Sequence, residues 1–353
     1  MSQDPTLTRQ KLDTIWEGRG TSSMPLQGKK FAVLSDLHLG DGSGSDNFRY
    51  NENALKAALT EYRGNGYELI LLGDIEEFWQ FDLDKIKSRY ENTVYSLMKA
   101  VGDDKIHRIF GNHDIEWSDQ PDPTKRNPIP PQRSTESIIL QDKTGIPRIL
   151  LIHGHQGSLE SDKTSWFSRF WVKVYAKTVE SFVDWLGIRQ EPAATKSAVP
   201  SDYEKIMYSW ARDNKVILVC GHSHRAIFAS STYLDSLKSQ LRDLQVWMYA
   251  NRSDKSKKKQ ISETLRKMEK IQVDITDEEN KKRNIDALDP DRKKPLPCYF
   301  NSGCGLYTDG LTAIEIDEDE IKLVKWSNRG SKDPEFDKYK GEIKTFLSAI
   351  DRA

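Results

Sequence analysis

Five short, largely apolar runs punctuate this chain, and a polar cluster follows each of them at once. The runs are Phe31–Leu34, Leu69–Leu72, Ile106–Phe110, Ile149–Ile152 and Val216–Val219. Runs of this length, bounded by glycine and polar residues, are typical of buried strands. Apolar residues also recur at spacings of three and four over 54–62 and 86–101, which predicts helices there. The alternation of strands and helices predicts an α/β fold whose sheet is covered on both faces.

Further apolar runs complete the predicted core. Ile138–Leu140 and Ile149–Ile152 flank a Thr144-Gly145 turn, so we expect them to pair. Three strand-like runs close the chain, at Tyr299–Asn301, Leu311–Ile316 and Ile321–Trp326. We therefore expect one domain over 29–326, between a polar tail at 1–28 and a C-terminal segment at 327–353.

Two insertions interrupt the alternation. Residues 156–212 carry aromatic and aliphatic side chains at helical spacing and predict a helical cap. Residues 231–296 are heavily charged and predict an exposed helical arm. The stretch from Asp119 to Gln132 is rich in proline and predicts an irregular loop.

Composition excludes several classes of protein. The chain has 353 residues, 37% of them hydrophobic and 30% charged, with a net charge of −1, so its overall charge favours no nucleic-acid partner. Its three cysteines form no paired-spacing motif, which favours a reducing compartment over a disulfide framework. The polar start shows no apolar signal-peptide region and no run is long enough to span a membrane, so we expect a cytoplasmic protein.

The five polar clusters hold six of the seven histidines in the chain. Their chemistry-bearing residues are Asp36, His38, Asp74, Asn112, His113, Asp114, His153, His155, His222 and His224. Because each cluster directly follows a predicted buried strand, we expect all five to meet at one edge of a sheet. A mixed set of nitrogen and oxygen ligands without thiolate suits Mn, Fe, Zn, Ni or Co better than Ca.

Individual positions suggest roles within such a centre. Asp36 and His38 are two residues apart and would face the same side of a strand, while Asp74 has two oxygens with which to bridge two cations. His113 is the best candidate for proton transfer, with Asp114 holding its other ring nitrogen. His155 has two open interpretations, a contact to a ligand or substrate and a structural role. Glu77 is either a support for the site or an exposed acid at a helix start.

These motifs together resemble the calcineurin-like metallophosphoesterases. The resemblance spans Asp36-x-His38, Gly73-Asp74-x-x-Glu77, Gly111-Asn112-His113-Asp114, His153 and Gly221-His222-x-His224. It implies a four-layer α/β/β/α sandwich with a two-metal site and attack on phosphorus by a hydroxide that bridges the metals. It also implies one metal held by Asp36, His38, Asp74 and His224, and another by Asp74, Asn112, His153 and His222. His113 would be the catalytic histidine, supported by Asp114, and Mn is the first choice of metal.

Within that superfamily the motifs are most similar to the UDP-2,3-diacylglucosamine pyrophosphatase branch. The similarity lies in Ser35-Asp36-Leu37-His38-Leu39-Gly40, in Gly73-Asp74-x-x-Glu77-x-Trp79 and in the helical insertion. The chain departs from the branch at His155, where an aspartate is usual, and in its added 231–296 segment.

The expected substrate is a phosphomonoester, a phosphodiester or a pyrophosphate, because one metal pair serves all three. The aromatic insertion has three interpretations: a lining for an amphipathic substrate, a helix packed on the sandwich, or a peripheral membrane contact. A Ser/Thr protein phosphatase and a nuclease are alternatives, although residues 251–296 carry only 14 Lys and Arg against 10 Asp and Glu. A scaffold that binds a partner through the charged arm is a third, and the intact ligand set argues against it.

Overall fold

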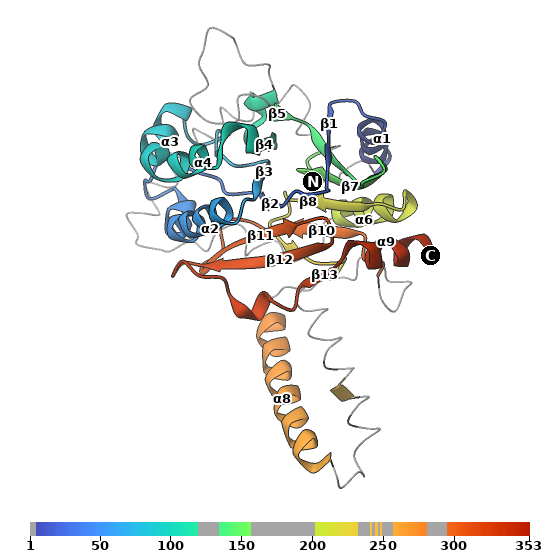
Figure 1. Cartoon of the computed structure of the whole chain (residues 1–353). Helices are drawn as coiled ribbons and strands as arrows, with labels where there is room; N and C mark the ends of the chain where they lie inside the picture. Colours follow the sequence, from blue (N-terminus) through green and yellow to red (C-terminus); the bar gives the residue numbers. More distant parts are fainter. Residues whose placement is uncertain are drawn as a thin grey trace.

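Two β-sheets face each other at the centre of the computed structural model, with helices on both outer sides (Figure 1). The structure describes residues 5–118, 134–156, 202–231, 257–280 and 295–353, with isolated positions between 241 and 248. The predicted α/β sandwich is therefore confirmed. The five clusters were expected at one edge of a single sheet, and this was wrong in one respect: three of the preceding strands lie in one sheet and two in the other.

The first sheet has seven strands and contributes three of the polar clusters. Their order is β13 (Lys340–Glu342), β12 (Glu320–Ser327), β11 (Gly310–Ile316), β2 (Phe31–Leu34), β3 (Glu68–Leu72), β4 (Ile106–Ile109) and β5 (Ser134–Thr135). Strands β2 to β5 run parallel, so the loops after β2, β3 and β4 leave the sheet at the same edge. Strands β11, β12 and β13 extend it in antiparallel fashion.

The second sheet has six strands and contributes the other two clusters. Their order is β1 (Thr21–Pro25), β6 (Ser137–Gln141), β7 (Pro147–Ile152), β8 (Ile217–Cys220), β10 (Tyr299–Ser302) and β9 (Ala226–Ile227). Strands β7 and β8 are parallel, so the loops that carry their histidines also leave at one edge.

Side chains of β2 and β3 alternate between two hydrophobic cores, as the period of two along a strand requires. Phe31, Val33, Ile70 and Leu72 face the second sheet, whereas their neighbours in sequence face the outer helices. Those helices are α2 (Glu52–Gly64), α3 (Leu83–Tyr90) and α4 (Ser96–Val101). On the opposite side, α1 (Pro5–Trp16) packs with α6 (Asp202–Asp213) against the second sheet. Four layers result.

The helix predicted over 86–101 contains an irregular turn. A π-helical turn, η2 (Glu91–Tyr95), separates α3 from α4. The extra residue in a π turn rotates the following side chains, and Tyr95 is buried here. In the described residues the remaining short elements are the 3₁₀ turns η1 (Asn47–Asn51), η3 (Asp103–Lys105), η4 (Ile115–Ser118) and η8 (Pro334–Phe336).

The polar tail predicted for 1–28 is wrong. Helix α1 buries Thr8, Leu12 and Ile15, and β1 pairs in parallel with β6 at the edge of the second sheet. The apolar positions of α1 are too few to stand out in the sequence, although they suffice to bury one face of a short helix. At the other end, β13 pairs with β12 and α9 (Ile343–Asp351) buries Ile343 and Ile350, so the C-terminal segment also joins the fold.

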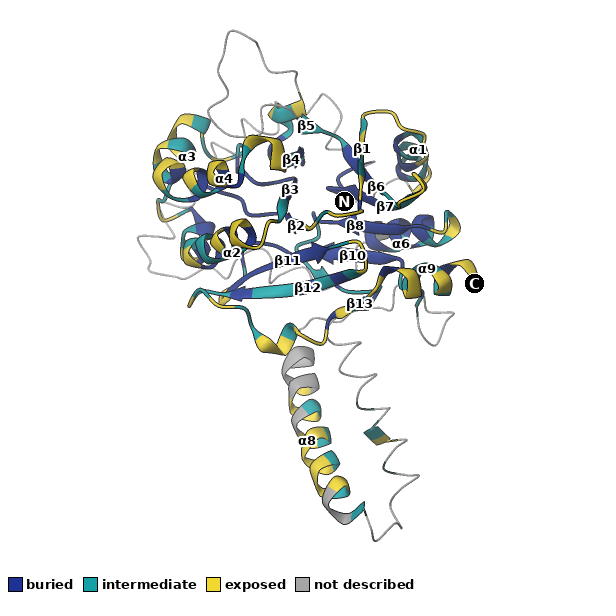
Figure 2. Cartoon of the chain, in the orientation of Figure 1, coloured by how far each residue is buried: buried dark blue, intermediate teal, exposed yellow. Residues whose placement is uncertain are grey.

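Three predictions fall mainly outside the described residues. These are the proline-rich loop at 119–132, the cap predicted over 156–212 and most of the arm. Residues 202–212 of the predicted insertion lie in α6. Within the arm the structure describes α8 (Lys258–Asn280), whose described side chains are exposed or half-buried (Figure 2).

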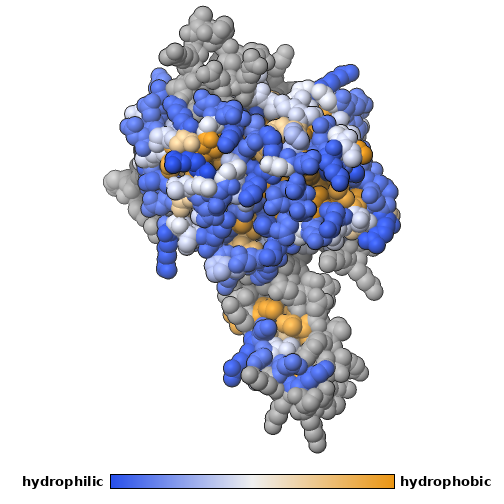
Figure 3. All heavy atoms as spheres, viewed as in Figure 1, coloured by the Kyte–Doolittle hydropathy of each residue, from blue (hydrophilic) through white to orange (hydrophobic). Residues whose placement is uncertain are grey.

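Polar side chains dominate the outer surface of the sandwich on the face drawn in Figure 3. None of the described helices is both long and apolar enough to cross a bilayer.

Candidate metal centre

The loops that follow β2, β3, β4, β7 and β8 carry the predicted site residues to one place between the sheets. Asp36 and His38 follow β2, Asp74 follows β3, and Asn112 and His113 follow β4. Backbone hydrogen bonds tie the first two loops together, since the Asp36 and His38 amides donate to the carbonyls of Gly73 and Asp74 at 3.0 Å each. The His222 amide, after β8, donates to Asp36 Oδ2 at 2.9 Å, so the two sheets meet at this polar edge.

One group consists of Asp36, His38 and His224, whose potential ligand atoms all lie within 4.8 Å of one another. His224 Nε2 lies 3.2 Å from Asp36 Oδ1 and 3.1 Å from His38 Nε2. Two imidazole nitrogens and a carboxylate oxygen thus converge on one point.

A second group consists of Asp74, His153 and His222, within the same distance limit. Asp74 Oδ2 lies 3.1 Å from His153 Nε2 and 4.0 Å from His38 Nε2, so this carboxylate stands between the two groups. His153 Nδ1 donates to the Leu72 carbonyl at 2.8 Å, which turns Nε2 toward Asp74.

Two buried atoms of the predicted ligands have no hydrogen-bond partner among the described residues. They are Asn112 Oδ1 and His153 Nε2, which lies near Asp74 without hydrogen-bond geometry. Orphaned polar atoms are costly inside a protein unless water or an ion satisfies them. Both are atoms through which Asn and His bind divalent cations, so the donor set fits metal ions.

The buried carboxylates and histidines of the site shift one another's pKa values. Burial alone would raise the pKa of Asp74, but the positive charges on His153 and His113 hold it well below its ordinary value. Burial opposes charge on His153 too, yet Asp74 and Asp36 raise its pKa to about 10. Burial lowers the pKa of His222 to about 4, aided by the neighbouring His153. A neutral His222 is the form that binds a metal.

Five of the predicted ligands have left-handed backbone. The φ angles are 52° at Asp36, 50° at His38, 53° at Asp74, 66° at His222 and 56° at His224. They make up five of the eight such non-glycine residues in the described part of the chain. Left-handed backbone is unfavourable for residues with a Cβ, and strain of this kind gathers at functional sites.

Close packing of the loops explains two of the glycines. A Cβ at Gly73, which has a φ of 82°, would overlap the His153 ring, and a Cβ at Gly111 would overlap Asp74. Any larger residue would push the ligands apart.

A comparison with protein-family models gives a match to the calcineurin-like phosphoesterases over residues 29–226. This chain is a calcineurin-like phosphoesterase. Enzymes of this family are hydrolases that act on phosphoric esters and use divalent metals. No curated protein matched the chain in a second comparison.

In this phosphoesterase, Glu77 connects two of the site histidines. Its Oε2 lies 2.8 Å from His38 Nδ1, and its Oε1 lies 2.9 Å from His113 Nδ1. Burial would raise the pKa of Glu77, but the charge and hydrogen bond of His113 lower it to about 2. Burial would lower the pKa of His113, but the negative charges of Asp74 and Glu77 and the hydrogen bond to Glu77 raise it to about 9. Of the two interpretations of Glu77, the structure favours a support for the site.

The expectation that Asp114 holds the His113 ring was wrong. Asp114 is buried and accepts the backbone N–H groups of Gly111 at 2.6 Å and Ile75 at 2.9 Å. Both oxygens of Asp114 are therefore occupied by backbone amides. The ring nitrogen Nδ1 of His113 is hydrogen-bonded to Glu77 instead. Burial and the nearby carboxylates raise the pKa of Asp114 to about 7.

Sequence reasoning assigned no role in the site to Trp79. Its ring stacks on His113, with centroids 3.8 Å apart and planes 20° from parallel, and its Nε1 donates to the Asn112 carbonyl at 3.0 Å. The spacing Glu77-x-Trp79 was the sequence pattern that could have indicated this role.

His155 is buried beside His153 and Phe110, and its Nδ1 has no hydrogen-bond partner among the described residues. It belongs to none of the ligand groups found there.

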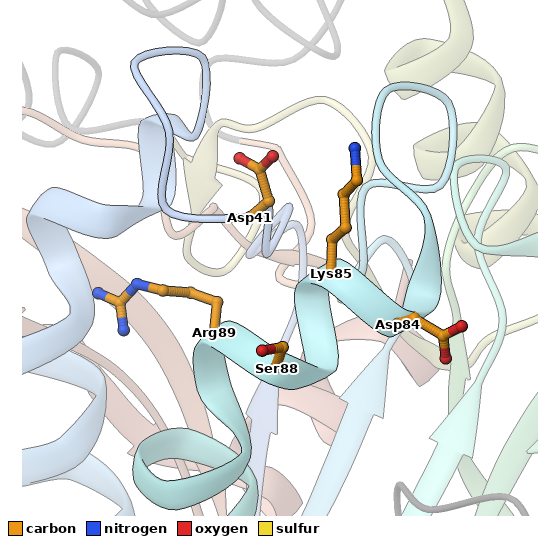
Figure 4. Close-up of a pocket in the computed structure, with 5 residues that line it drawn as sticks. All are labelled: Asp41, Asp84, Lys85, Ser88 and Arg89. Carbon is orange, nitrogen blue, oxygen red and sulfur yellow. The ribbon is translucent and has the colours of Figure 1, made fainter.

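A surface hollow of about 490 Å³ lies beside the loop that follows His38. It is lined by Asp41 of that loop and by Asp84, Lys85, Ser88 and Arg89 of α3 (Figure 4). None of the predicted metal ligands lines it, so the hollow is not the metal centre of this phosphoesterase.

Proposed function

We propose that this protein hydrolyses a phosphate ester or a diphosphate at a centre of two metal ions. Asp36, His38, Asp74 and His224 would hold one ion, and Asp74, Asn112, His153 and His222 the other. The observation that carries the proposal is the position of Asp74, whose Oδ2 lies 3.1 Å from His153 and 4.0 Å from His38. A carboxylate placed between two ligand groups is suited to bridging two cations.

Bound metal ions would activate water near neutral pH and offset negative charge on the phosphoryl oxygens. The protein's own contribution is the position of its donors. The five ligands with left-handed backbone are all among the side chains whose ligand atoms converge in the two groups. With Nδ1 of His113 facing Glu77, Nε2 is directed to donate a proton to the leaving-group oxygen or to stabilise a phosphoryl oxygen.

For the substrate we propose a diphosphate with an amphipathic leaving group, as in the UDP-2,3-diacylglucosamine pyrophosphatase branch. Support comes from the Glu77-x-Trp79 motif, whose two side chains both contact His113. His155 departs from the branch and is buried beside the ligand His153. His155 belongs to neither ligand group, so we expect the departure to affect the choice of substrate.

The proposal is tested by metal analysis combined with hydrolysis assays. The purified protein, loaded with Mn²⁺, is assayed with para-nitrophenyl phosphate, with bis-para-nitrophenyl phosphate and with UDP-diacylglucosamine. We expect two metal ions per chain and metal-dependent turnover, with the diphosphate preferred. Turnover of a model ester alone would retain the enzyme and reject the substrate. Absence of both metal and turnover would overturn the proposal.

A further inference from the structure

A buried network of charged and aromatic side chains lies beneath the metal centre, and none of its members is a predicted ligand. Its middle is the carboxylate of Glu76, which is fully buried. Arg108 Nη1 donates to Oε2 at 2.6 Å and Nη2 to Oε1 at 3.1 Å. Tyr95 Oη donates to Oε1 at 3.1 Å, and Trp117 Nε1 donates to Oε2 at 2.9 Å. The four donors satisfy both carboxylate oxygens.

These donors come from three separate segments. Arg108 lies on β4, Tyr95 in the π turn between α3 and α4, and Trp117 in η4, while Glu76 belongs to the loop after β3. The guanidinium also lies 4.8 Å from the centre of the Trp117 ring. A regular helix would turn Tyr95 to a different side, so the π turn is needed for this contact.

The network is connected to the metal loops by short steps. Glu76 is two residues beyond Asp74, and Arg108 is four residues before Asn112. Arg108 Nη1 also lies 3.7 Å from Asp114 Oδ2, and Asp114 accepts the amides of Ile75 and Gly111. Arg108 therefore joins the carboxylates of two strand-end loops, which carry Asp74 and Asn112.

A need for stability alone does not explain a buried ion pair. The cost of removing both charges from water commonly equals the gain from their attraction, and apolar side chains of similar size are often as stable. A network in which both oxygens of a buried carboxylate are paired supplies a fixed geometry, and here Arg108 Nε is the one nitrogen of the guanidinium without a hydrogen-bond partner among the described residues. Here that geometry concerns the spacing of two loops that must hold ligands within a few tenths of an ångström.

We propose that Glu76 and Arg108 are positioning residues of the metal centre. Their ion pair, held by Tyr95 and Trp117, fixes the loop after β3 against the loop after β4 and so sets the distance between Asp74 and Asn112. This inference rests on the proposed metal centre. It predicts that loosening the network weakens metal binding in a protein that remains folded.

The experiment compares two isosteric tyrosine variants and one charge variant. Tyr95→Phe removes a hydroxyl from the network. Tyr62→Phe, the control, removes an equally buried hydroxyl that accepts from Trp326 Nε1 at 3.0 Å on the outer face of the sheet. Glu76→Gln retains the shape of the carboxylate and removes its charge. For each protein, Mn²⁺ affinity is measured by calorimetric titration, and the melting temperature is measured without metal.

We expect Glu76→Gln to weaken Mn²⁺ binding by about tenfold or more, as removal of groups that support ligands commonly does. Tyr95→Phe should weaken it in the same direction, while Tyr62→Phe lowers the melting temperature and leaves Mn²⁺ affinity unchanged. A purely structural network would give Tyr95→Phe and Glu76→Gln proteins with lower melting temperatures and wild-type affinity, and that result would overturn the inference. If the wild-type protein binds no Mn²⁺, the proposed function itself fails. If the Glu76→Gln protein does not fold, the Mn²⁺ affinity of the Tyr95→Phe protein decides between these outcomes.

Discussion

Trp79 lies flat against the ring of His113, with the two ring centroids 3.8 Å apart. His113 is held on one side by this stacking and at Nδ1 by Glu77, which leaves its ring little freedom to rotate. The indole also bonds the carbonyl of Asn112, so one side chain supports a predicted ligand and the predicted proton donor.

Substitutions at Trp79 should show whether kcat depends on the stacking of an aromatic ring against His113. We expect Trp79→Ala to lower kcat by about tenfold, less than the roughly 100-fold or more that a positioned acid typically contributes, because the His113 ring becomes free to turn but is still present. Trp79→Phe keeps an aromatic face and should retain most of the activity. Trp16→Ala, which removes a remote edge-to-face contact with Trp210, serves as the control and should change stability without changing kcat. Equal kcat in both Trp79 variants would argue against stacking.

Asp74 contacts both ligand groups, so its charge should be indispensable. Asp74→Asn should reduce the metal content below two ions per chain and lower turnover by about a thousandfold or more, since in the proposed mechanism the metals would supply both the nucleophile and charge neutralisation. The comparison variant is Asp104→Asn on an exposed 3₁₀ turn, which should match the wild type. Metal content and hydrolysis of para-nitrophenyl phosphate are the measurements. Full activity in Asp74→Asn protein would refute the assignment of the site.

Glu77 should act through the histidines it touches. In Glu77→Gln protein the amide nitrogen would face either His38 or His113, so one of these two hydrogen bonds would be lost or change direction. We therefore expect kcat to fall about 10–100-fold while two metal ions still bind. The matched control is Glu61→Gln, which removes a half-exposed partner of Lys332. Steady-state kinetics alongside metal analysis distinguish the outcomes. A loss of metal comparable to that in Asp74→Asn would instead indicate that Glu77 is a ligand.

Removing the metals should destabilise the fold. Binding to the native state alone stabilises it by about 2.7 kcal/mol at a free concentration 100 times the dissociation constant. Dialysis against a chelator should therefore lower the melting temperature by several degrees, and added Mn²⁺ should restore it. The Asp74→Asn protein should show a much smaller response to chelator and metal. An identical response in both proteins would place the stabilising ion elsewhere.

Glu68 provides a pH test far from the metal centre. Burial would raise its pKa, but hydrogen bonds from Lys29 and His107, both at 2.8 Å, lower it below the ordinary value. A lowered folded pKa stabilises the protein above the unfolded pKa, and this stability is lost as pH falls through the folded value. Glu68→Gln should therefore cost up to about 1 kcal/mol at pH 7, and the difference from wild type should shrink below about pH 4.

Urea unfolding at several pH values measures this difference. Glu91→Gln, which breaks an exposed helix pair with Lys87, is the control and should have a smaller effect at every pH. A Glu68→Gln difference that grows toward acid pH would contradict the assignment of the ion pairs.

The strands next to the site were predictable because burial on both faces leaves continuous apolar runs. The run Phe31–Leu34 coincides with β2, and the run Leu69–Leu72 lies within β3. An apolar run predicts a strand but does not indicate which strand it pairs with. The division of the five clusters between two sheets could therefore not be predicted from periodicity. The helix α1 was missed since only one narrow face is apolar and its neighbours are polar.

Among the site residues, the sequence indicated which side chains would converge and was less informative about their partners. Asp114 directly follows His113, and adjacency in sequence suggested contact. Neighbouring side chains in a turn often point apart, and the Asp114 carboxylate accepts hydrogen bonds from the amides of Gly111 and Ile75. Glu77, from a different loop, reaches the ring instead. Such choices depend on distances between loops that only the folded chain defines.

The left-handed turns at the ligands have a consequence for how this sequence can change. Glycine adopts that backbone without strain, so replacing His222 or Asp36 with glycine would relieve a local cost at the same time as it removes a ligand. Selection for thermal stability in metal-free buffer, without an assay for hydrolysis, would therefore tend to erode this site. Libraries built on this scaffold will need the ligand positions held constant, because at those positions the fold and the chemistry favour different residues.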